Sequence, residues 1–222
     1  MKILIIVAMT SELEGFLKIK DFEIKLISGV KVYYYKENDK EIYLAKTEVG
    51  KVNASSLTTF LLLKLKPKYV INSGIAGALN PSLNLFDVIV SSKVCYHDFD
   101  LTAFNLPLGQ LDNHDLYFKI SKKLINATSS NTIKGLIVSG DQFISSKENL
   151  TKINKNFKKA LCCDMEGTAI VHTCENFKRK AIVIRAISDN AFLTNQISQY
   201  EDNKFKAIDV IVKETMFLID NL

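Results

Sequence analysis

The sequence predicts a layered α/β fold in which helices pack on a mixed β-sheet. Short apolar runs rich in Ile and Val alternate with longer amphipathic segments, as is typical of strands and helices packed in layers. Three strand-like runs follow one another near the N-terminus, so part of the sheet is antiparallel. The 222 residues contain no repeat and no linker rich in Gly, Ser or Pro, which indicates one domain over residues 1–222.

The strands are assigned from apolar and aromatic runs. The first of them, Ile3–Met9, indicates a buried strand, Tyr33–Tyr35 marks the middle one of the three consecutive strands, and 181–187 is apolar except for Arg185. The run 69–72 is a short strand that leads into a glycine-rich turn. The predicted strands are residues 2–8, 22–28, 31–36, 41–46, 69–72, 87–94, 133–138, 159–163 and 181–187.

The helices fall between these strands. Ser11 and Glu14 have capping-box spacing and predict a helix start, and the next helical segment is rich in Leu. The three prolines lie at predicted element boundaries. The predicted helices are residues 11–17, 51–65, 114–126, 147–155, 166–176 and 201–220.

Composition excludes several classes of function. The longest apolar runs are far shorter than the ~18 residues that a membrane-spanning helix needs, so we expect no membrane partner. The net charge is +5, but only Arg179 and Arg185 among the 29 basic residues are arginines, and the lysines are scattered. Nucleic-acid recognition usually needs arginine forks on one concentrated basic face, so we expect no nucleic-acid partner.

Cysteine and histidine usage predicts neither a disulfide framework nor a metal site. The four cysteines form no CxxC pair, and the three histidines lack zinc-ligand spacing, so a reducing, cytoplasmic location is the simpler interpretation. The apolar N-terminal run could be part of a signal peptide, but it is only about seven residues long and no small-x-small cleavage site follows.

Three acidic residues follow predicted strands, where α/β proteins bind ligands. Glu12 follows the first strand, Glu166 follows 159–163 and Asp189 follows 181–187. A structural interpretation is also open for each, because Glu12 and Glu166 would favour the first turn of a helix and Asp189 could be an N-cap. The pattern alone leaves a polar site and three structural acids as alternatives.

Other polar residues admit two interpretations. The turn Gly74–Gly77 could bring backbone amides close to a ligand, or could be only a tight turn. Arg185 could pair with a site acid or a ligand oxygen, or could reach solvent at a strand end. His97 and Asp98 would point to opposite faces of an extended segment, which disfavours a dyad. His172 in a helix, like Cys162 and Cys163 on a strand, is expected to be structural.

Seven segments spread along nearly the whole chain resemble the 5′-methylthioadenosine/S-adenosylhomocysteine nucleosidases of the purine nucleoside phosphorylase superfamily. Their order and spacing agree with the family as well as their content. The segments are Ile5–Glu12, Val49–Ala54, Ile71–Gly77, Tyr96–Phe104, Gly135–Ile144, Asp164–Ile170 and Val183–Asp189.

The resemblance implies a single nucleoside phosphorylase/hydrolase-like domain, a three-layer αβα sandwich around a twisted mixed β-sheet. It also implies a homodimer and a role in methionine salvage. It implies hydrolysis of the adenine–ribose N-glycosidic bond without metal or organic cofactor, releasing adenine and a thioribose product. By this resemblance Asp189 protonates adenine N7, Glu12 activates water and Glu166 holds the ribose hydroxyls. A carboxylate can accept both hydroxyl hydrogens of a cis-diol, and Asp189 would need a raised pKa to be protonated near neutral pH.

The resemblance also implies binding residues. Phe143 would stack on adenine, the main chain of Ile144 would read the base edge, and Met165 would pack on the ribose. Met9 and Val49 would line the alkylthio pocket. The further residues are Ala76 and Gly77 near the substrate, Ser188 orienting Asp189, Arg185 ordering the polar network, and Leu101 and Phe104 supplied across the dimer interface. Tyr200 is a candidate aromatic residue in the 190–200 region, which aligns poorly.

Two other functions remain as alternatives. A purine nucleoside phosphorylase would use phosphate, but phosphate sites favour arginine forks, and a carboxylate at Glu12 would repel the anion. A non-catalytic nucleoside-binding protein would not need Glu12, Glu166 and Asp189 together. The sequence leaves open the preference among methylthioadenosine, S-adenosylhomocysteine, 5′-deoxyadenosine and aminodeoxyfutalosine.

Overall fold

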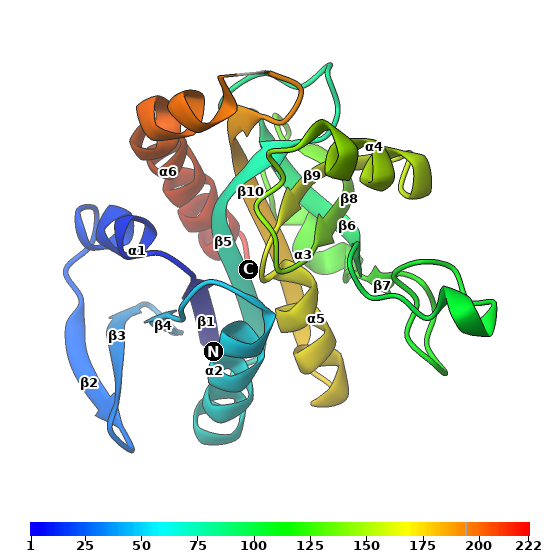
Figure 1. Cartoon of the computed structure of the whole chain (residues 1–222). Coiled ribbons are helices and arrows are strands. Elements are labelled where there is room, and N and C mark those ends of the chain that lie inside the picture. The colour runs from blue at the N-terminus through cyan, green and yellow to red at the C-terminus, as the bar shows by residue number, and fades with distance from the viewer. Residues whose placement is uncertain (194) are drawn as a thin grey trace.

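A computed structural model describes residues 1–193 and 195–222 and shows a large mixed sheet flanked by helices (Figure 1). The strands are β1 (Lys2–Val7), β2 (Glu23–Ile27), β3 (Val30–Glu37), β4 (Lys40–Lys46), β5 (Tyr69–Ala78), β6 (Val88–Tyr96), β7 (Phe118–Lys119), β8 (Ile133–Ser139), β9 (Ala160–Asp164) and β10 (Lys180–Asn190). The helices are α1 (Thr10–Leu17), α2 (Lys51–Leu65), α3 (Lys122–Asn126), α4 (Lys147–Asn156), α5 (Gly167–Asn176) and α6 (Gln196–Asp220), with a short 3₁₀ turn over Thr102–Phe104.

The sheet is mixed, as the sequence predicted. β1 pairs in parallel with β4 on one side and β5 on the other, and β4, β3 and β2 continue as an antiparallel meander. β10 pairs in parallel with β5 and antiparallel with β6. Because β6, β8, β9 and β5 also pair in turn, this half of the sheet closes on itself.

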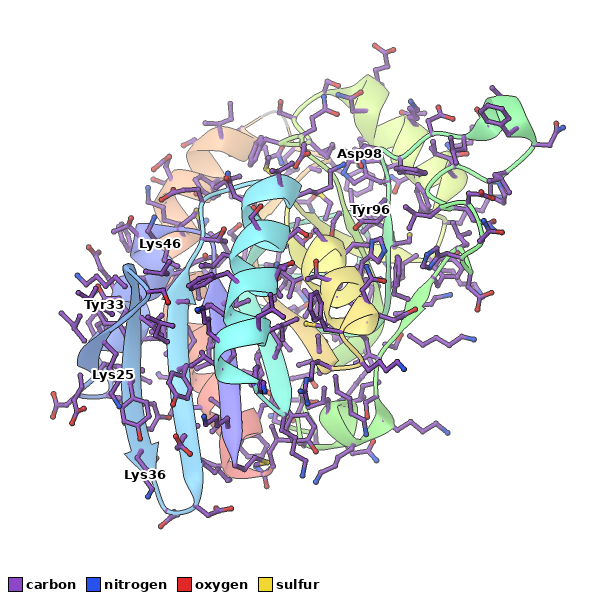
Figure 2. All side chains as sticks on the ribbon, turned by 90° about the horizontal axis from the view of Figure 1, so that it is seen from below. Lys25, Tyr33, Lys36, Lys46, Tyr96 and Asp98 are labelled. Atoms are coloured by element: carbon purple, nitrogen blue, oxygen red, sulfur yellow. The ribbon has the colours of Figure 1, made fainter. Side chains whose placement is uncertain are left out.

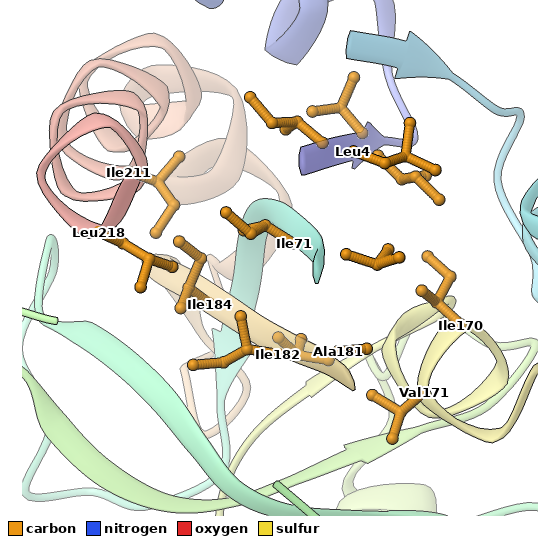
Figure 3. Packing of buried hydrophobic residues seen from close by; sticks show 14 of the residues in the cluster. Leu4, Ile71, Ile170, Val171, Ala181, Ile182, Ile184, Ile211 and Leu218 are labelled. Carbon is orange, nitrogen blue, oxygen red and sulfur yellow. The ribbon is translucent and has the colours of Figure 1, made fainter. Parts of the chain in front are cut away.

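Two groups of helices cover the sheet. α6 packs on β5 and β10 together with α1, while α5 packs on β8 and β10 together with α2. Figure 3 shows Ile211 and Leu218 of α6 on one side of these strands, and Ile170 and Val171 of α5 on the other. All four side chains are buried, as expected for strands covered on both faces. The layered α/β prediction is therefore confirmed.

The β2–β3 hairpin lies at the open edge of the sheet and is far more exposed. It carries Lys25, Tyr33 and Lys36 (Figure 2). The ammonium group of Lys25 lies 3.1 Å from the ring centroid of Tyr34, a cation–π contact. Charged side chains on an edge strand discourage pairing with another chain.

The helix predicted over 114–126 is wrong in its first half. Only Lys122–Asn126 is helical, and Phe118–Lys119 instead forms β7 beside β6. Asn113 adopts a left-handed backbone conformation, and Phe118 is buried against the sheet. Local polarity resembled a helix start, but burial of Phe118 decides the conformation.

β5 and β10 extend several residues beyond their predicted bounds, and α6 begins earlier than predicted. β5 continues through the glycine-rich segment to Ala78, because β10 pairs with it as far as Asn190. Asp189 therefore lies on β10 rather than at a helix N-cap, which removes that structural interpretation. α6 begins at Gln196 instead of residue 201. Across the part of the chain that the structure describes, no helix combines the length and apolarity of a membrane span.

Candidate active site

A cavity of about 410 Å³ opens where β5, β9 and β10 end and where α1 begins after β1. This is the edge of the sheet at which the sequence placed the three acids, and all three line the cavity. The lining residues are Ala8, Met9, Glu12, Val49, Ile75, Ala76, Gly77, Gln142, Phe143, Ile144, Cys163, Asp164, Met165, Glu166, Ser188, Asp189, Gln196, Ile197, Tyr200 and Glu201.

Glu12 lies in the first turn of α1, and three backbone amides hold its carboxylate. Its Oε2 accepts the N–H groups of Ala8 and Met9, both at 3.0 Å, and its Oε1 accepts the N–H of Ile75 at 3.1 Å. Burial raises the pKa of Glu12, while the Arg185 charge and these amides act in the opposite direction. A carboxylate that only stabilised the start of α1 would not also accept an N–H from β5, as Glu12 does from Ile75. The three hydrogen bonds together fix the orientation of the carboxylate toward the cavity.

Gly74 makes this arrangement possible. A Cβ atom at this position would lie 2.5 Å from Oε1 of Glu12. The glycine-rich segment therefore allows the close approach of the Glu12 side chain, in addition to the approach of a ligand that its sequence left open. Residue 74 must be small because the Glu12 carboxylate occupies the space beside it.

Arg185 lies behind the cavity and is not part of its lining. Its guanidinium is 2% exposed and lies 2.7 Å from Oδ2 of Asp164. It also donates to the Asn72 carbonyl at 3.1 Å and to the Asn72 side chain. The strand-end interpretation in which Arg185 reaches solvent is therefore wrong, and the ion-pair interpretation is confirmed. Removing one partner of such a buried pair typically costs 3–5 kcal/mol of stability.

Asp189 has different partners from Glu12. Its Oδ1 accepts the Ser188 hydroxyl at 2.6 Å, and its Oδ2 accepts the side-chain amide of Gln196 at 2.7 Å. Burial raises the pKa of Asp189, and the two hydrogen bonds partly oppose this. Among the charged groups that the structure describes, no cation contributes to this shift. The protonated form is therefore more accessible than in an ordinary aspartate.

Glu166 is the residue that precedes α5, and its Oε1 accepts the N–H of Gly50 at 2.9 Å. Burial and the nearby Asp164 charge raise its pKa to about 7, and the Gly50 amide and Arg185 lower it. Its side chain makes no N-cap hydrogen bond to α5, which argues against a purely structural role. The second carboxylate oxygen remains available for ligand hydroxyls.

Asp164 was not recognised as a site residue from the sequence. Its Oδ1 accepts the hydroxyl of Ser139 and the N–H of Gly167 at 3.1 Å, and its Oδ2 faces Arg185. The buried Arg185 was the available signal, since a buried guanidinium needs a carboxylate. Asp164 thus fixes the segment that carries Met165 and Glu166.

An apolar wall completes the cavity. Phe143 and Tyr200 meet edge to face with ring centroids 6.0 Å apart, and the Tyr200 hydroxyl lies 3.4 Å from the sulfur of Met9. The remaining apolar lining residues are Ala8, Val49, Ile75, Ala76, Ile144, Met165 and Ile197, together with Gly77. This wall suits a flat aromatic ring and an apolar substituent.

The structure brings together most of the predicted binding residues, with three exceptions. Leu101 and Phe104 do not line this chain's cavity, and Phe104 is 74% exposed. Arg185 acts from behind, through Asp164. Gln196 and Ile197 were missed because α6 begins before the predicted position, and Gln142, Cys163 and Glu201 carried no distinguishing pattern.

Of the residues expected to be structural, His172 and Cys162 lie outside the cavity lining, whereas Cys163 is part of it. His172 contacts Tyr96 through a 3.1 Å hydrogen bond and packs on Phe118. His97 is buried beside Gly140, outside the cavity lining. Cys163 does line the cavity, but burial raises its pKa, so it is a poor nucleophile.

The charged lining of the cavity has one sign. Among the residues that the structure describes, every charged side chain that lines it is acidic: Glu12, Asp164, Glu166, Asp189 and Glu201. Within the same residues, no group of three or more His, Cys, Asp or Glu side chains has the arrangement of a metal site. Carboxylates can donate or accept protons and can accept hydrogen bonds from hydroxyl groups.

The chain is similar to known proteins over nearly its whole length. The family described as the phosphorylase superfamily matches residues 2–218. A Borrelia burgdorferi protein described as a 5′-methylthioadenosine/S-adenosylhomocysteine nucleosidase, bound to adenine, is 35% identical over 99% of this chain and 100% of its own, with a TM-score of 0.93.

Two Helicobacter pylori structures are also similar. One is a mutant nucleosidase with 5′-methylthioadenosine in its active site, 30% identical over 100% of this chain and 99% of its own, with a TM-score of 0.92. The other is described as a futalosine hydrolase, 29% identical over 100% of this chain and 98% of its own, also with a TM-score of 0.92. All three relatives are similar to this chain from end to end.

Proposed function

The chain belongs to the phosphorylase superfamily, and from that premise we propose that it hydrolyses the N-glycosidic bond of 5′-methylthioadenosine and S-adenosylhomocysteine, and also of 5′-deoxyadenosine. Similar solved structures are described as nucleosidases for the first two compounds. The observation that carries the proposal is the set of three buried carboxylates, Glu12, Glu166 and Asp189, around one cavity with an apolar wall. The products are adenine and the corresponding 5-thioribose or 5-deoxyribose.

Asp189 is the proposed general acid. Adenine leaves poorly as an anion, so a proton delivered to N7 as the C1′–N9 bond breaks lets the base depart neutral. The bond electrons pass into the purine ring. Burial raises the pKa of Asp189, which favours the protonated form that this step needs. Phe143 would stack on the adenine ring beside it.

Glu12 is the proposed base for water. Its two oxygens accept three backbone N–H groups and retain lone pairs that can bind a water molecule. Water oxygen bonds to C1′ on the face opposite adenine and loses its proton to Glu12. Glu166 would accept the ribose hydroxyls and stabilise positive charge on the sugar in the transition state. Exchange with solvent then returns Glu12 and Asp189 to their starting states.

The acidic lining favours water over phosphate as the nucleophile. Phosphate needs Arg or Lys groups, whereas every charged side chain in the described lining is a carboxylate. Arg185 is occupied by Asp164 and Asn72 behind the cavity. A phosphorylase would need a cation where this chain has Glu12.

We further propose that the enzyme is a cytoplasmic homodimer that acts in methionine salvage. Phe104 projects into solvent in the single chain, and Leu101 lies outside its cavity, so a second copy could receive both at the alkylthio end beside Val49. The four cysteines are unpaired, which is the usual state in a reducing compartment. The dimer is tested by sedimentation of the unaltered protein, compared with sedimentation of a Phe104→Ala variant.

The decisive assay is adenine release from methylthioadenosine by purified protein, with and without phosphate. We expect adenine and free methylthioribose in phosphate-free buffer. A sugar 1-phosphate that forms only with phosphate would identify a phosphorylase instead. Futalosine is the second substrate to assay, because one similar structure is described as a futalosine hydrolase. Nucleoside binding with no release from any substrate would indicate a non-catalytic binding protein.

A further inference from the structure

Three charged side chains meet just outside the cavity, each from a different segment of the chain. The ammonium group of Lys51 lies 2.7 Å from Oδ2 of Asp98 and 3.7 Å from Oδ2 of Asp141. The Asp141 N–H donates to Asp98 Oδ2 at 2.8 Å, and the Lys51 N–H donates to Asp141 Oδ1 at 2.8 Å. These contacts form a closed circuit, which we name the Lys51 cluster: Lys51, Asp98 and Asp141.

The Lys51 cluster is directly connected to Glu166. Lys51 is the first residue of α2, and Gly50 before it has a positive φ of 104°. The N–H of Gly50 donates to Glu166 Oε1 at 2.9 Å, while the next N–H, from Lys51, goes to Asp141. Two successive amides are thus held by two carboxylates, so displacement of Lys51 would rotate the Gly50 amide away from Glu166.

The same cluster joins segments that form the cavity wall. Val49 lies on one side of Gly50, and Gln142 and Phe143 follow Asp141. A Cβ on Gly50 would lie 3.3 Å from Asp141 Oδ1, so the two segments are in close contact. Asp98 comes from the third segment of the cluster, which follows β6. Figure 2 shows Asp98, together with Tyr96, beside α2.

An ordinary surface ion pair would not have these features. Exposed pairs contribute little to stability and need no main-chain partners. The side chains of Lys51 and Asp98 are only 23% and 27% exposed, although that of Asp141 is 46% exposed. Both aspartates also accept backbone N–H groups from other segments, which fixes main-chain geometry as well as charge.

We propose that the Lys51 cluster is a positioning device that holds the Gly50 amide against Glu166 and thereby sets the affinity of the site for the ribose hydroxyls. The inference rests on the proposed function, because it takes Glu166 as the residue that binds those hydroxyls. Lys51, Asp98 and Asp141 do not line the cavity. They act through Gly50.

The test compares Lys51→Met with Lys51→Arg and with the control Lys20→Met, which removes a lysine from the Lys20–Glu37 surface pair. For Lys51→Met we expect the KM for methylthioadenosine to rise about five-fold with little change in kcat, roughly the worth of one hydrogen bond. Lys51→Arg should restore most of the affinity, and Lys20→Met should have no effect.

Two readouts separate positioning from a general loss of structure. The first is a methylthioadenosine analogue that lacks both the 2′- and 3′-hydroxyls, whose binding should weaken much less in Lys51→Met because the contacts to Glu166 are absent from it. The second is the acid limb of kcat/KM. The Gly50 N–H lowers the pKa of Glu166, so its loss should move this limb to higher pH. Asp164, Arg185 and Glu12, the charged groups that face Glu166, are unchanged in the variant.

Equal weakening of both substrates, or an unchanged KM and acid limb in a Lys51→Met protein that melts normally, would overturn the proposal. If Lys51→Met has a lowered melting temperature, Asp141→Asn is the second variant, because it keeps the shape of the side chain and removes the charge. The same measurements on Asp141→Asn then support or overturn the proposal. Absence of adenine release by the unaltered enzyme would instead refute the proposed function.

Discussion

The two ends of the cavity hold their carboxylates in different ways. Burial raises the pKa of both carboxylates. At one end, three backbone amides bind Glu12, and these amides and the Arg185 charge oppose that rise and favour the ionised form. At the other end, two neutral side chains bind Asp189, and no described cation offsets its burial. The first environment suits a base that must be ionised, and the second suits an acid that must carry a proton. The same residue class thus acquires opposite roles from its donors.

The largest effect is expected from removing the acid. Asp189→Asn keeps the shape of the side chain but supplies no acidic proton, so kcat should fall by about 10⁴-fold, the upper part of the range for general acid catalysis. The Gln196 amide can rotate to face the new amide, so the fold should persist. Adenine release measures the loss, and calorimetry with methylthioadenosine measures binding.

Binding should survive in Asp189→Asn even though turnover does not. Asp202→Asn is the matched control, since this exposed aspartate lies on α6 outside the cavity lining. Normal turnover by Asp189→Asn would contradict the assignment of the acid end.

Removing the base should lower kcat somewhat less than removing the acid. Glu12→Gln presents an NH₂ group to one set of backbone N–H donors and cannot accept a proton, so kcat should fall by about 10³-fold. Single-turnover measurements at saturating substrate isolate the chemical step. Glu14→Gln, an exposed neighbour on α1, should behave as the unaltered enzyme. Equal loss in both variants would indicate disturbance of α1 instead of loss of a base.

The sequence could predict the three acids of the site but not most of the groups that surround each of them. Glu12, Glu166 and Asp189 were found because each stands at a strand end, and chain order alone indicates that edge of the sheet. The partners were not found, because they depend on three-dimensional register. Asp164 meets Arg185 only when β9 and β10 both pair with β5, and Gln196 meets Asp189 only because α6 starts early. The helix predicted over 114–126 failed for a similar reason, since Phe118 pairs with β6.

Gly74 offers a way to displace the base without removing it. In Gly74→Ala the new Cβ would lie 2.5 Å from Glu12 Oε1, so the carboxylate must move. Because that atom ends a flexible side chain, the melting temperature should change little while kcat falls by about 10²-fold, the lower part of the range for general base catalysis. Parallel melting and activity measurements test this. A large loss of stability with normal specific activity of the folded fraction would contradict it.

The smallest expected effect is a shift in the pH dependence of kcat/KM, which tests the assignment of Asp189 as the acid. The kcat/KM profile should be bell-shaped, because Glu12 and Glu166 must be ionised and Asp189 must be protonated. Gln196 donates to the ionised form of Asp189 and so lowers its pKa. In Gln196→Leu that pKa rises, and the alkaline limb should therefore move to higher pH by about half a unit to one unit, the value of one hydrogen bond. The acid limb belongs to the other end and should stay in place. Ser188→Ala removes the second donor and should shift the same limb in the same direction. If either variant moved the acid limb instead, Asp189 would not be the group that must hold the proton.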